Sequence, residues 1–221
     1  NLAAAMQLET SRPIFVICPD EAAAGRIKRD LELFLEKPVQ TLCARDFNFY
    51  GAEGVSRESE QRRIRTLCEL ISGHAPIVVC TVTGLMQRTM PPGALKKASV
   101  ELHDGQAFSL EKAEQALINC GYTRTAQVEG PGQFSRGGGI LDFFSPAYDS
   151  PIRCEFWGDD IDSMGFFDID SQRRTDALEH CEILPSREIL PTLGEGEILP
   201  DKLWALIKNA EKRGQTKLAQ T

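Results

Sequence analysis

The chain lacks several features that would place it in a common functional class. No run of 18 apolar residues occurs, which argues against a membrane-spanning helix. The seven cysteines contain no CxxC pair, so a zinc site has no support. Their odd number and mostly apolar surroundings predict buried, reduced thiols in a cytoplasmic protein. The three histidines are far apart, and no nucleophilic triad is recognisable. We therefore expect no catalytic residue, metal ligand or cofactor in this chain.

A phosphate-binding loop is also missing, because no glycine is followed by lysine. The triple glycine Gly137–Gly139 leads into the apolar run Ile140–Phe144, which predicts a strand rather than the helix start that a phosphate cradle needs. Glycines that permit close backbone approach at a strand start are the simpler interpretation. The opening residues 1–7 have the composition of the middle of a helix. We expect a piece of a longer protein, in which such a loop could precede residue 1.

Charge is unevenly distributed along the chain, whose net charge is -7. Residues 1–104 are balanced, whereas residues 105–177 carry six basic and twelve acidic side chains. An acidic segment repels phosphate, so it favours a protein partner over DNA. The basic cluster from Arg57 to Arg65 has glutamates interspersed. A solvated, salt-bridged helix face is the favoured interpretation of that cluster, and a DNA contact is the alternative.

The spacing of apolar residues predicts two kinds of architecture. In the first half, short apolar runs near 13–18, 39–43, 76–82 and 99–102 alternate with helical patterns at 20–36, 56–72 and 83–88. This alternation predicts a parallel sheet with helices on both faces, which Pro91-Pro92-Gly93 then interrupts. The second half has one helix, 109–120, and strands near 122–128, 139–144, 152–157 and 161–169, with a hairpin turn at 158–160.

We therefore predict an α/β domain with an inserted small α+β domain that contains an antiparallel sheet. The predicted bounds are 1–104 for the first part of the α/β domain, 105–177 for the inserted domain, 178–191 for a return to the first domain, and 192–221 for a linker and a C-terminal helix.

One predicted strand carries the strongest functional signal. In residues 152–157, Ile152, Cys154 and Phe156 alternate with a second set made of Arg153, Glu155 and Trp157. The first set predicts a core face. The second set combines arginine with tryptophan on the solvent face, which is typical of a protein-binding hot spot. Arg124 and Arg136 lie near in sequence and could add hydrogen bonds to partner carboxylates. The alternatives are a chance surface tryptophan and one packed under a helix of its own domain.

The residues of this region resemble a known family. The segments are Gly132-Gln-Phe-Ser-Arg-Gly-Gly-Gly-Ile-Leu-Asp142, Phe144-Ser-Pro146, Pro151-Ile-Arg-Cys-Glu-Phe-Trp-Gly-Asp-Asp-Ile-Asp-Ser163 and Phe167-Asp-Ile-Asp-Ser-Gln-Arg173. Together they resemble the UvrB-homology module of bacterial excision repair, over roughly residues 5–191. UvrB has a long aromatic hairpin after the second strand, where this chain has only the loop 44–56. The resemblance therefore favours the transcription-repair coupling factors.

The resemblance implies a fold and a function. The expected fold is a doubly wound, degenerate P-loop NTPase-like domain with the small domain inserted. The expected function is non-catalytic, namely recruitment of UvrA to stalled RNA polymerase in transcription-coupled nucleotide excision repair. The parent protein would be an ATP-dependent DNA translocase, with ATP, RNA polymerase and DNA bound by its other domains and this part monomeric. The alternative is a fragment of an ATP-dependent UvrB-type or helicase-type enzyme that acts on damaged DNA.

The resemblance also implies which residues bind UvrA. The family's partner-binding positions match Arg153 and Trp157, with Arg124, Arg136 and Glu155 as further members of the set. One position departs from the family pattern, because Gly137 occupies the usual arginine slot and Arg136 lies one place earlier. A shift of one residue on a strand sends a side chain to the opposite face, so the contribution of Arg136 depends on the local backbone.

Overall fold

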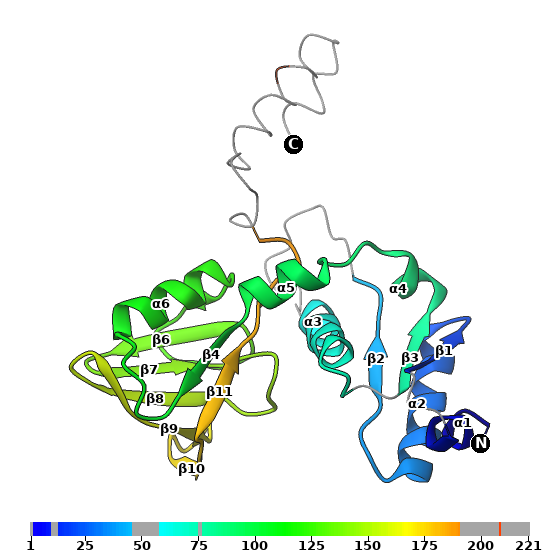
Figure 1. Cartoon of the computed structure of the whole chain (residues 1–221), viewed down its shortest axis with the longest axis horizontal. Coiled ribbons are helices and arrows are strands. Elements are labelled where there is room, and N and C mark those ends of the chain that lie inside the picture. The colour runs from blue at the N-terminus through cyan, green and yellow to red at the C-terminus, as the bar shows by residue number, and fades with distance from the viewer. Residues whose placement is uncertain (1, 10–12, 46–57, 75–76, 191–207, 209–221) are drawn as a thin grey trace. The chain divides into compact units, whose positions relative to one another are not determined.

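The computed structural model describes residues 2–9, 13–45, 58–74, 77–190 and 208 (Figure 1). In this part of the chain, helices combine with a three-stranded, a six-stranded and a two-stranded sheet, so the protein is of mixed α/β type, as predicted. Residues 1–188 form one compact unit. The predicted linker and C-terminal helix at 192–221 lie outside the described residues, apart from Lys208.

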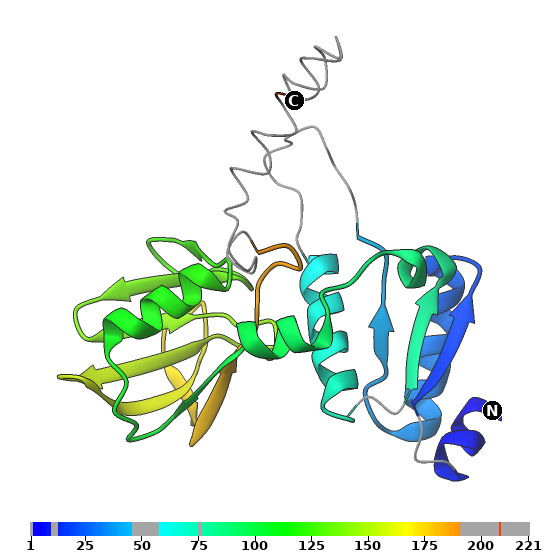
Figure 2. The same cartoon turned by 45° about the horizontal axis from the view of Figure 1, so that its top comes forward.

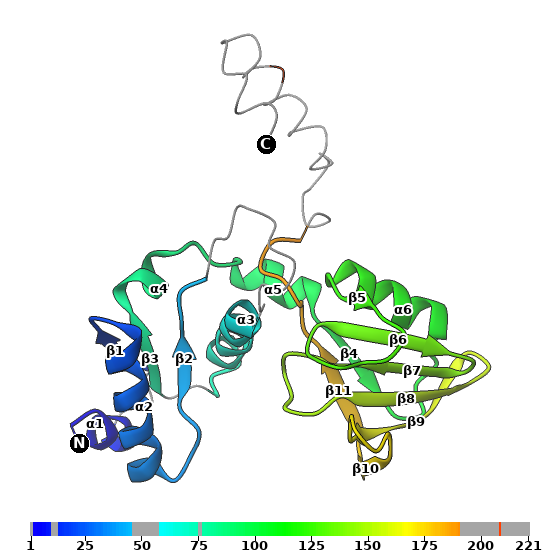
Figure 3. The same ribbon diagram turned by 180° about the vertical axis from the view of Figure 1, so that it is seen from behind.

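The three-stranded sheet is parallel, with the strand order β1-β3-β2. Its central strand is buried along its whole length, because helices cover both sides. Ile77 and Val79 pack with α2, whereas Val78 and Cys80 pack with α3 (Figures 1 and 3). The elements of this part are α1 (Leu2–Glu9), β1 (Ile14–Cys18), α2 (Glu21–Leu35), β2 (Gln40–Leu42), α3 (Glu58–Ile71), β3 (Ile77–Thr81) and α4 (Val82–Met86).

Local chemistry explains the bounds of α2. The carboxylate of Asp20 accepts a hydrogen bond from the backbone N–H of Ala23 at 2.7 Å and so caps the helix start. The helix ends at Leu35 and is followed by the C-cap residue Glu36, whose backbone is left-handed with φ 51°. The predicted helix 20–36 is therefore confirmed. The predicted cap of α3 at Ser56 and most of the predicted loop 44–56 lie outside the described residues.

One expectation for this half is wrong. The sequence predicts that Pro91-Pro92-Gly93 only interrupts the pattern, but α5 (Pro92–Ala98) begins there. Proline suits the first turn of a helix because its missing N–H would have no intrahelical partner at that position. Helix α5 leads directly into β4 (Val100–His103).

The six-stranded sheet has the order β10-β9-β8-β7-β6-β5 and is antiparallel except for the β5–β6 pair. Helix α6 lies along one of its faces (Figures 1 and 2). Leu110, Ala113 and Leu117 of that helix are buried against inward side chains of the strands. The elements are α6 (Leu110–Asn119), β5 (Thr123–Arg124), β6 (Gln133–Gly137), β7 (Ile140–Phe143), β8 (Ile152–Trp157), β9 (Asp160–Phe167) and β10 (Arg174–Ala177).

The structure adds two strands to those predicted for this sheet. The sequence predicts no strand between 128 and 139, but β6 lies there and contains Arg136, and the turn to β7 consists of Gly138 and Gly139. Strand β10 was not predicted at all. The predicted strand 152–157 is confirmed with the same bounds, and the predicted turn joins β8 to β9, with Trp157 paired to Asp160.

The third sheet pairs β4 with β11 (His180–Ile183) in antiparallel orientation. Their buried side chains Leu102, Cys181 and Ile183 belong to the same core as those of α6 and the six-stranded sheet. Both strands lie outside the predicted bounds 105–177 of the inserted domain, and the division of the chain at those bounds stays a prediction.

Candidate partner-binding face

The face of the six-stranded sheet opposite α6 is here called the outer face. At one end of it, the strand register aligns Gly137, Ile140, Glu155 and Ser163 in a row across β6, β7, β8 and β9. Residues paired across neighbouring strands point to the same side of a sheet, so these four share the outer face. A Cβ atom at Gly137 would meet no heavy atom within 4 Å, and Ile140 is 38% exposed. This end of the outer face is therefore open to a partner.

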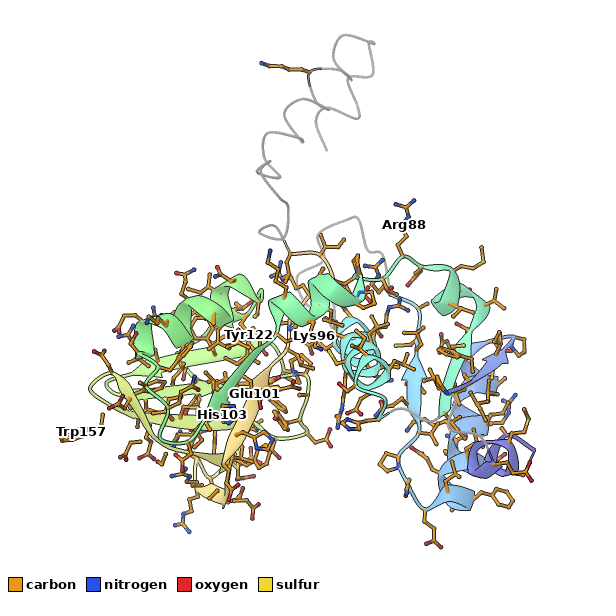
Figure 4. All side chains as sticks on the ribbon, viewed as in Figure 1. Arg88, Lys96, Glu101, His103, Tyr122 and Trp157 are labelled. Carbon is orange, nitrogen blue, oxygen red and sulfur yellow. The ribbon has the colours of Figure 1, made fainter. Side chains whose placement is uncertain are left out.

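Trp157 lies at the end of β8, beside the turn to β9, with 83% of its surface exposed. Figure 4 shows the indole projecting away from the sheet. Ile152 and Cys154 of the same strand are fully buried, and Phe156 packs against the same core, so the inward set has the position that the alternation predicts. An exposed indole on the strand that pairs with the exposed Ile140 is an apolar anchor of the kind enriched in protein interfaces.

Arg153 lies on the outer face but is already engaged within the chain. Its Nε and Nη2 donate to the two carboxylate oxygens of Asp142, each at 2.8 Å. Nη1 and Nη2 also reach the backbone and side-chain oxygens of Gln172, both at 3.2 Å, and the guanidinium lies 4.7 Å from the centre of the Phe167 ring. The hydrogen bonds that Arg153 donates to Asp142 raise the pKa of Arg153 above its ordinary value. Arg153 thus makes its bidentate contact with Asp142 of its own chain.

Arg124 and Arg136 lie on the opposite side of the sheet from Trp157. Arg136 pairs in register with Leu141, a fully buried core residue, so its side chain points to the α6 side. There it donates to Glu111 at 2.7 Å and to Glu114, and these hydrogen bonds raise the pKa of Arg136. Arg124 also pairs with Glu114, at 3.1 Å. The structure therefore separates these two arginines from Arg153, Glu155 and Trp157.

Sequence reasoning missed a further basic residue on the outer face. Arg174 of β10 donates from Nη1 to the hydroxyl of Ser163 at 3.0 Å and lies 3.8 Å from the carboxylate of Glu155. In the sequence, the one indication that Arg174 belongs to this face is its position directly after the segment Phe167–Arg173, which resembles the family. Its position over β9 depends on the pairing of β10, which has no apolar alternation to predict it.

Comparison with known proteins bears on this face. Residues 100–189 match the family model of the UvrB interaction domain. Over most of its length the chain is thus similar to part of the transcription-repair-coupling factors, and its residues 100–189 are similar to the UvrB interaction domain. It is 32% identical to the factor of Myxococcus xanthus over 188 residues, which are 81% of this chain and 16% of that protein. For the factors of Escherichia coli K12 and Bacillus subtilis 168 the identity is 29%, over 80% and 84% of this chain.

Two consequences follow for the site. The region that matches the UvrB interaction domain, residues 100–189, includes β4, α6, the six-stranded sheet and β11, and therefore all five residues predicted to bind a partner. It begins at residue 100, so it also takes in the strand pair β4–β11. The chain spans 15–16% of the length of the relatives named here, so it corresponds to a small part of each of those factors.

The structure also bears on the metal site and the basic cluster considered from the sequence. In the described residues, no group of histidine, cysteine and acidic side chains could hold a metal ion. Every helix of that same part is too short or too polar to cross a membrane. In the basic cluster, Arg62 pairs with Glu58, and Arg65 pairs with Asp149 at 2.6 Å. Arg63 is fully buried, and Arg57 lies outside the described residues. The described arginines of this cluster are therefore engaged within the chain.

Proposed function

We propose that this chain is a non-catalytic interaction module that recruits UvrA in transcription-coupled nucleotide excision repair. One observation carries the proposal: within a UvrB interaction domain, the open end of the outer face presents a tryptophan that is 83% exposed. Covering a large, rigid side chain that is exposed to water at the end of a strand lowers the free energy of a complex with a partner. The names of the relatives, transcription-repair-coupling factors, support the cellular role.

The surroundings of Trp157 suit such an anchor. Ile140 adds apolar surface, while Glu155 and Arg174 supply charged groups that are 43% and 33% exposed in their side chains. An apolar centre with a polar rim is the usual composition of a specific protein interface. Arg153 lies near this end of the outer face, and its hydrogen bonds to Asp142 and Gln172 link β8 to β7 and to the segment after β9. These links make this part of the face rigid. Binding therefore requires little ordering of the site itself, which favours affinity.

The α/β part supports a non-catalytic role. The order β1-β3-β2, with α2 and α3 on opposite faces, supports a doubly wound, degenerate P-loop-like fold. Ligands of such folds bind outside the carboxyl ends of the strands. Here the buried guanidinium of Arg63 donates to the carbonyl oxygens of Cys43, just after β2, and of Gly84, just after β3. A buried arginine that already bridges these two strand ends leaves them unsuited to nucleotide binding.

The remaining parts of the proposal concern the parent protein. We place this chain in a cytoplasmic, ATP-dependent DNA translocase whose other domains bind ATP, DNA and RNA polymerase. In that setting the chain acts as a monomeric docking module. No observation on the described residues favours the alternative of an ATP-hydrolysing fragment acting on damaged DNA.

The test is a titration of purified UvrA with the chain and two variants. Trp157→Ala removes the exposed anchor and is expected to weaken binding about thirtyfold, because truncating a central aromatic anchor typically costs about 2 kcal/mol. Ile118→Ala is the matched control, since Ile118 is 49% exposed on α6, away from the outer face. Isothermal titration calorimetry gives both affinities. Equal binding by the unmodified chain and both variants, or no binding by any of them, would contradict the proposal.

A further inference from the structure

The outer face carries two guanidinium groups, of Arg153 and Arg174, which differ in how many of their N–H donors are used in hydrogen bonds to described residues. Arg153 uses three nitrogen atoms in four hydrogen bonds, two of them to the carboxylate of Asp142, and its side chain is 19% exposed. Arg174 makes one hydrogen bond to a described side chain, the hydroxyl of Ser163, and its side chain is 33% exposed. Its nearest carboxylate, that of Glu155, is 3.8 Å away, beyond hydrogen-bond length.

The backbone makes room for Arg174 at this place. Strand β10 is the edge strand, and Arg174 pairs with Phe167 of β9. To reach Ser163, the side chain passes over Gly165, where an added Cβ would lie 2.4 Å from its Nε and 3.2 Å from its Cζ. Any side chain at position 165 would displace it. The absence of a side chain at Gly165 therefore lets an arginine from the edge strand lie across the outer face.

This position brings the charge next to the apolar anchor of the site. Ser163 and Glu155, the two groups that Arg174 approaches, belong to the same row as Ile140, and Glu155 lies two residues from Trp157 on β8. Residues 105–177 carry a net charge of -6, so an acidic partner is not attracted to this region by its overall charge. A partner carboxylate would need a direct contact with an available guanidinium, which has five N–H donors in a planar fork.

We propose that Arg174 is the residue of the outer face that contacts a carboxylate of the partner directly, with the Arg153–Asp142 pair as the rigid support beneath it. The proposal rests on the function proposed above and adds the chemistry of the partner's surface. That surface would combine an apolar pocket for Trp157 with an aspartate or glutamate near its edge. Ser163 and Glu155 hold Arg174 in place until the partner's carboxylate accepts its remaining donors.

The experiment measures binding of UvrA by chains altered at Arg174. Arg174→Ala is expected to weaken binding about tenfold, and Arg174→Glu more strongly, because it places two like charges together. Arg174→Lys should fall between the unmodified chain and Arg174→Ala, since lysine keeps the charge but loses the bidentate geometry. Lys112→Ala is the matched control, because it removes one positive charge from an exposed position of α6, away from the outer face, and should change affinity less than twofold.

Two further measurements distinguish a direct electrostatic contact of Arg174 from an effect on folding. Raising the salt concentration should weaken binding of the unmodified chain more than that of Arg174→Ala, because the contact is electrostatic. Circular dichroism should show the same melting temperature for Arg174→Ala and the unmodified chain within about 3 °C, since exposed substitutions have small effects on stability.

The outcomes separate this inference from the function on which it rests. If Trp157→Ala weakens binding and Arg174→Ala does not, the role of Arg174 is overturned and the proposed function stands. If Arg174→Ala strengthens binding, the partner presents a cation to Glu155, and the inference is again wrong. If UvrA does not bind the unmodified chain, both proposals fail together.

Discussion

At the scale of single residues, the exchange of arginine and glycine at positions 136 and 137 decides which face carries a charge. Arg136 shares the side of the buried Leu141, whereas Gly137 shares the outer face with Ile140 and Glu155. A strand alternates its side chains with period two, so moving one arginine by one residue transfers it through the sheet. In this chain the outer face therefore has an empty position where its relatives are expected to place an arginine.

Filling that position should strengthen binding. Gly137 has no neighbouring heavy atom within 4 Å of an added Cβ, and its φ lies outside the left-handed region, so Gly137→Arg is tolerated by the backbone. The new guanidinium would lie on the outer face near Glu155. We expect the affinity for UvrA to rise about fivefold, in line with about 1 kcal/mol for one added charged contact. Isothermal titration calorimetry measures the change.

Two controls accompany Gly137→Arg. Arg136→Ala removes a charge from the α6 side and should leave the affinity within about twofold, since Arg136 contacts Glu111 and Glu114 rather than the outer face. Gly137→Glu tests the sign of the effect, because a second carboxylate beside Glu155 should repel an acidic partner. Unchanged affinity in both Gly137→Arg and Gly137→Glu, with unchanged melting temperatures, would show that the partner does not use this face.

At the scale of whole elements, the sequence predicted those whose apolar spacing is strong. Strand β8 has its predicted bounds because Ile152 and Cys154 alternate with polar residues, and α2 begins at its predicted cap, Asp20. Strands β6 and β10 were missed because both are short and polar and their pairing comes from neighbouring strands. The sequence does not predict α5, because proline and glycine often break helices, although proline favours a first helical turn.

In the candidate site, the sequence likewise predicts what depends on one strand but not what depends on the pairing of several strands. Alternation within one strand was enough to place Arg153 and Glu155 on one face and Cys154 on the other. It could not show that Asp142 pairs with Arg153, because that contact depends on the register between β7 and β8. The contribution of Arg174 depends likewise on the register of β10 and on the space over Gly165. Contacts between strands distant in sequence therefore required the structure.

A buried charge cluster joins several elements at the carboxyl end of the parallel sheet. Arg63 of α3 and Glu188 are both buried, with 3.2 Å between the Nε of Arg63 and the carboxylate. Arg45 contacts the other carboxylate oxygen at 2.8 Å, and the backbone N–H of Glu188 donates to Glu60 at 2.7 Å. This cluster fixes the chain after β11 to α3.

Glu188→Ala should destabilise the protein by about 3 kcal/mol, because it leaves the buried Arg63 without its carboxylate. Urea unfolding followed by circular dichroism measures this change, with the midpoint falling and the slope unchanged. Glu182→Ala is the matched control, since Glu182 is exposed on β11 and its removal should cost less than about 0.5 kcal/mol. Equal midpoints for the two variants would show that the buried cluster contributes no stability.

At the scale of the whole molecule, residues 1–188 contain two main cores within one compact unit. Contacts between distant segments join the two cores. Gln61 donates to the carbonyl oxygen of Pro131 at 2.9 Å, and Arg65 pairs with Asp149 at 2.6 Å, in addition to the bonds of Glu188. Small units with shared contacts of this kind usually unfold in one cooperative transition. We therefore expect the α/β part and the UvrB interaction domain to unfold together.

Two cysteines report on this cooperativity, one in each part. Burial raises the pKa of Cys68, in α3, and of Cys120, after α6, to about 12. Only the thiolate form of cysteine reacts. With a pKa of about 12, each of these cysteines is a thiolate in about one of 10⁴ folded molecules at pH 8. An unfolded cysteine has a pKa of about 8.5, so unfolding raises its reactivity about a thousandfold. Reactivity in the folded state should rise about tenfold per pH unit up to at least pH 10, since the raised pKa lies above that range.

A short pulse of iodoacetamide at pH 8 in increasing urea, read by peptide mass spectrometry, tests the expectation. Cys68 and Cys120 should become labelled at the same urea concentration, because the contacts that join the two cores are lost in the same transition. In Glu188→Ala both midpoints should fall together. Labelling of Cys68 at a lower urea concentration than Cys120 would mean that the α/β part unfolds first, leaving the UvrB interaction domain folded. The outer face would then be stabilised by its own core alone, since every buried residue of that core lies between Leu102 and Ile183.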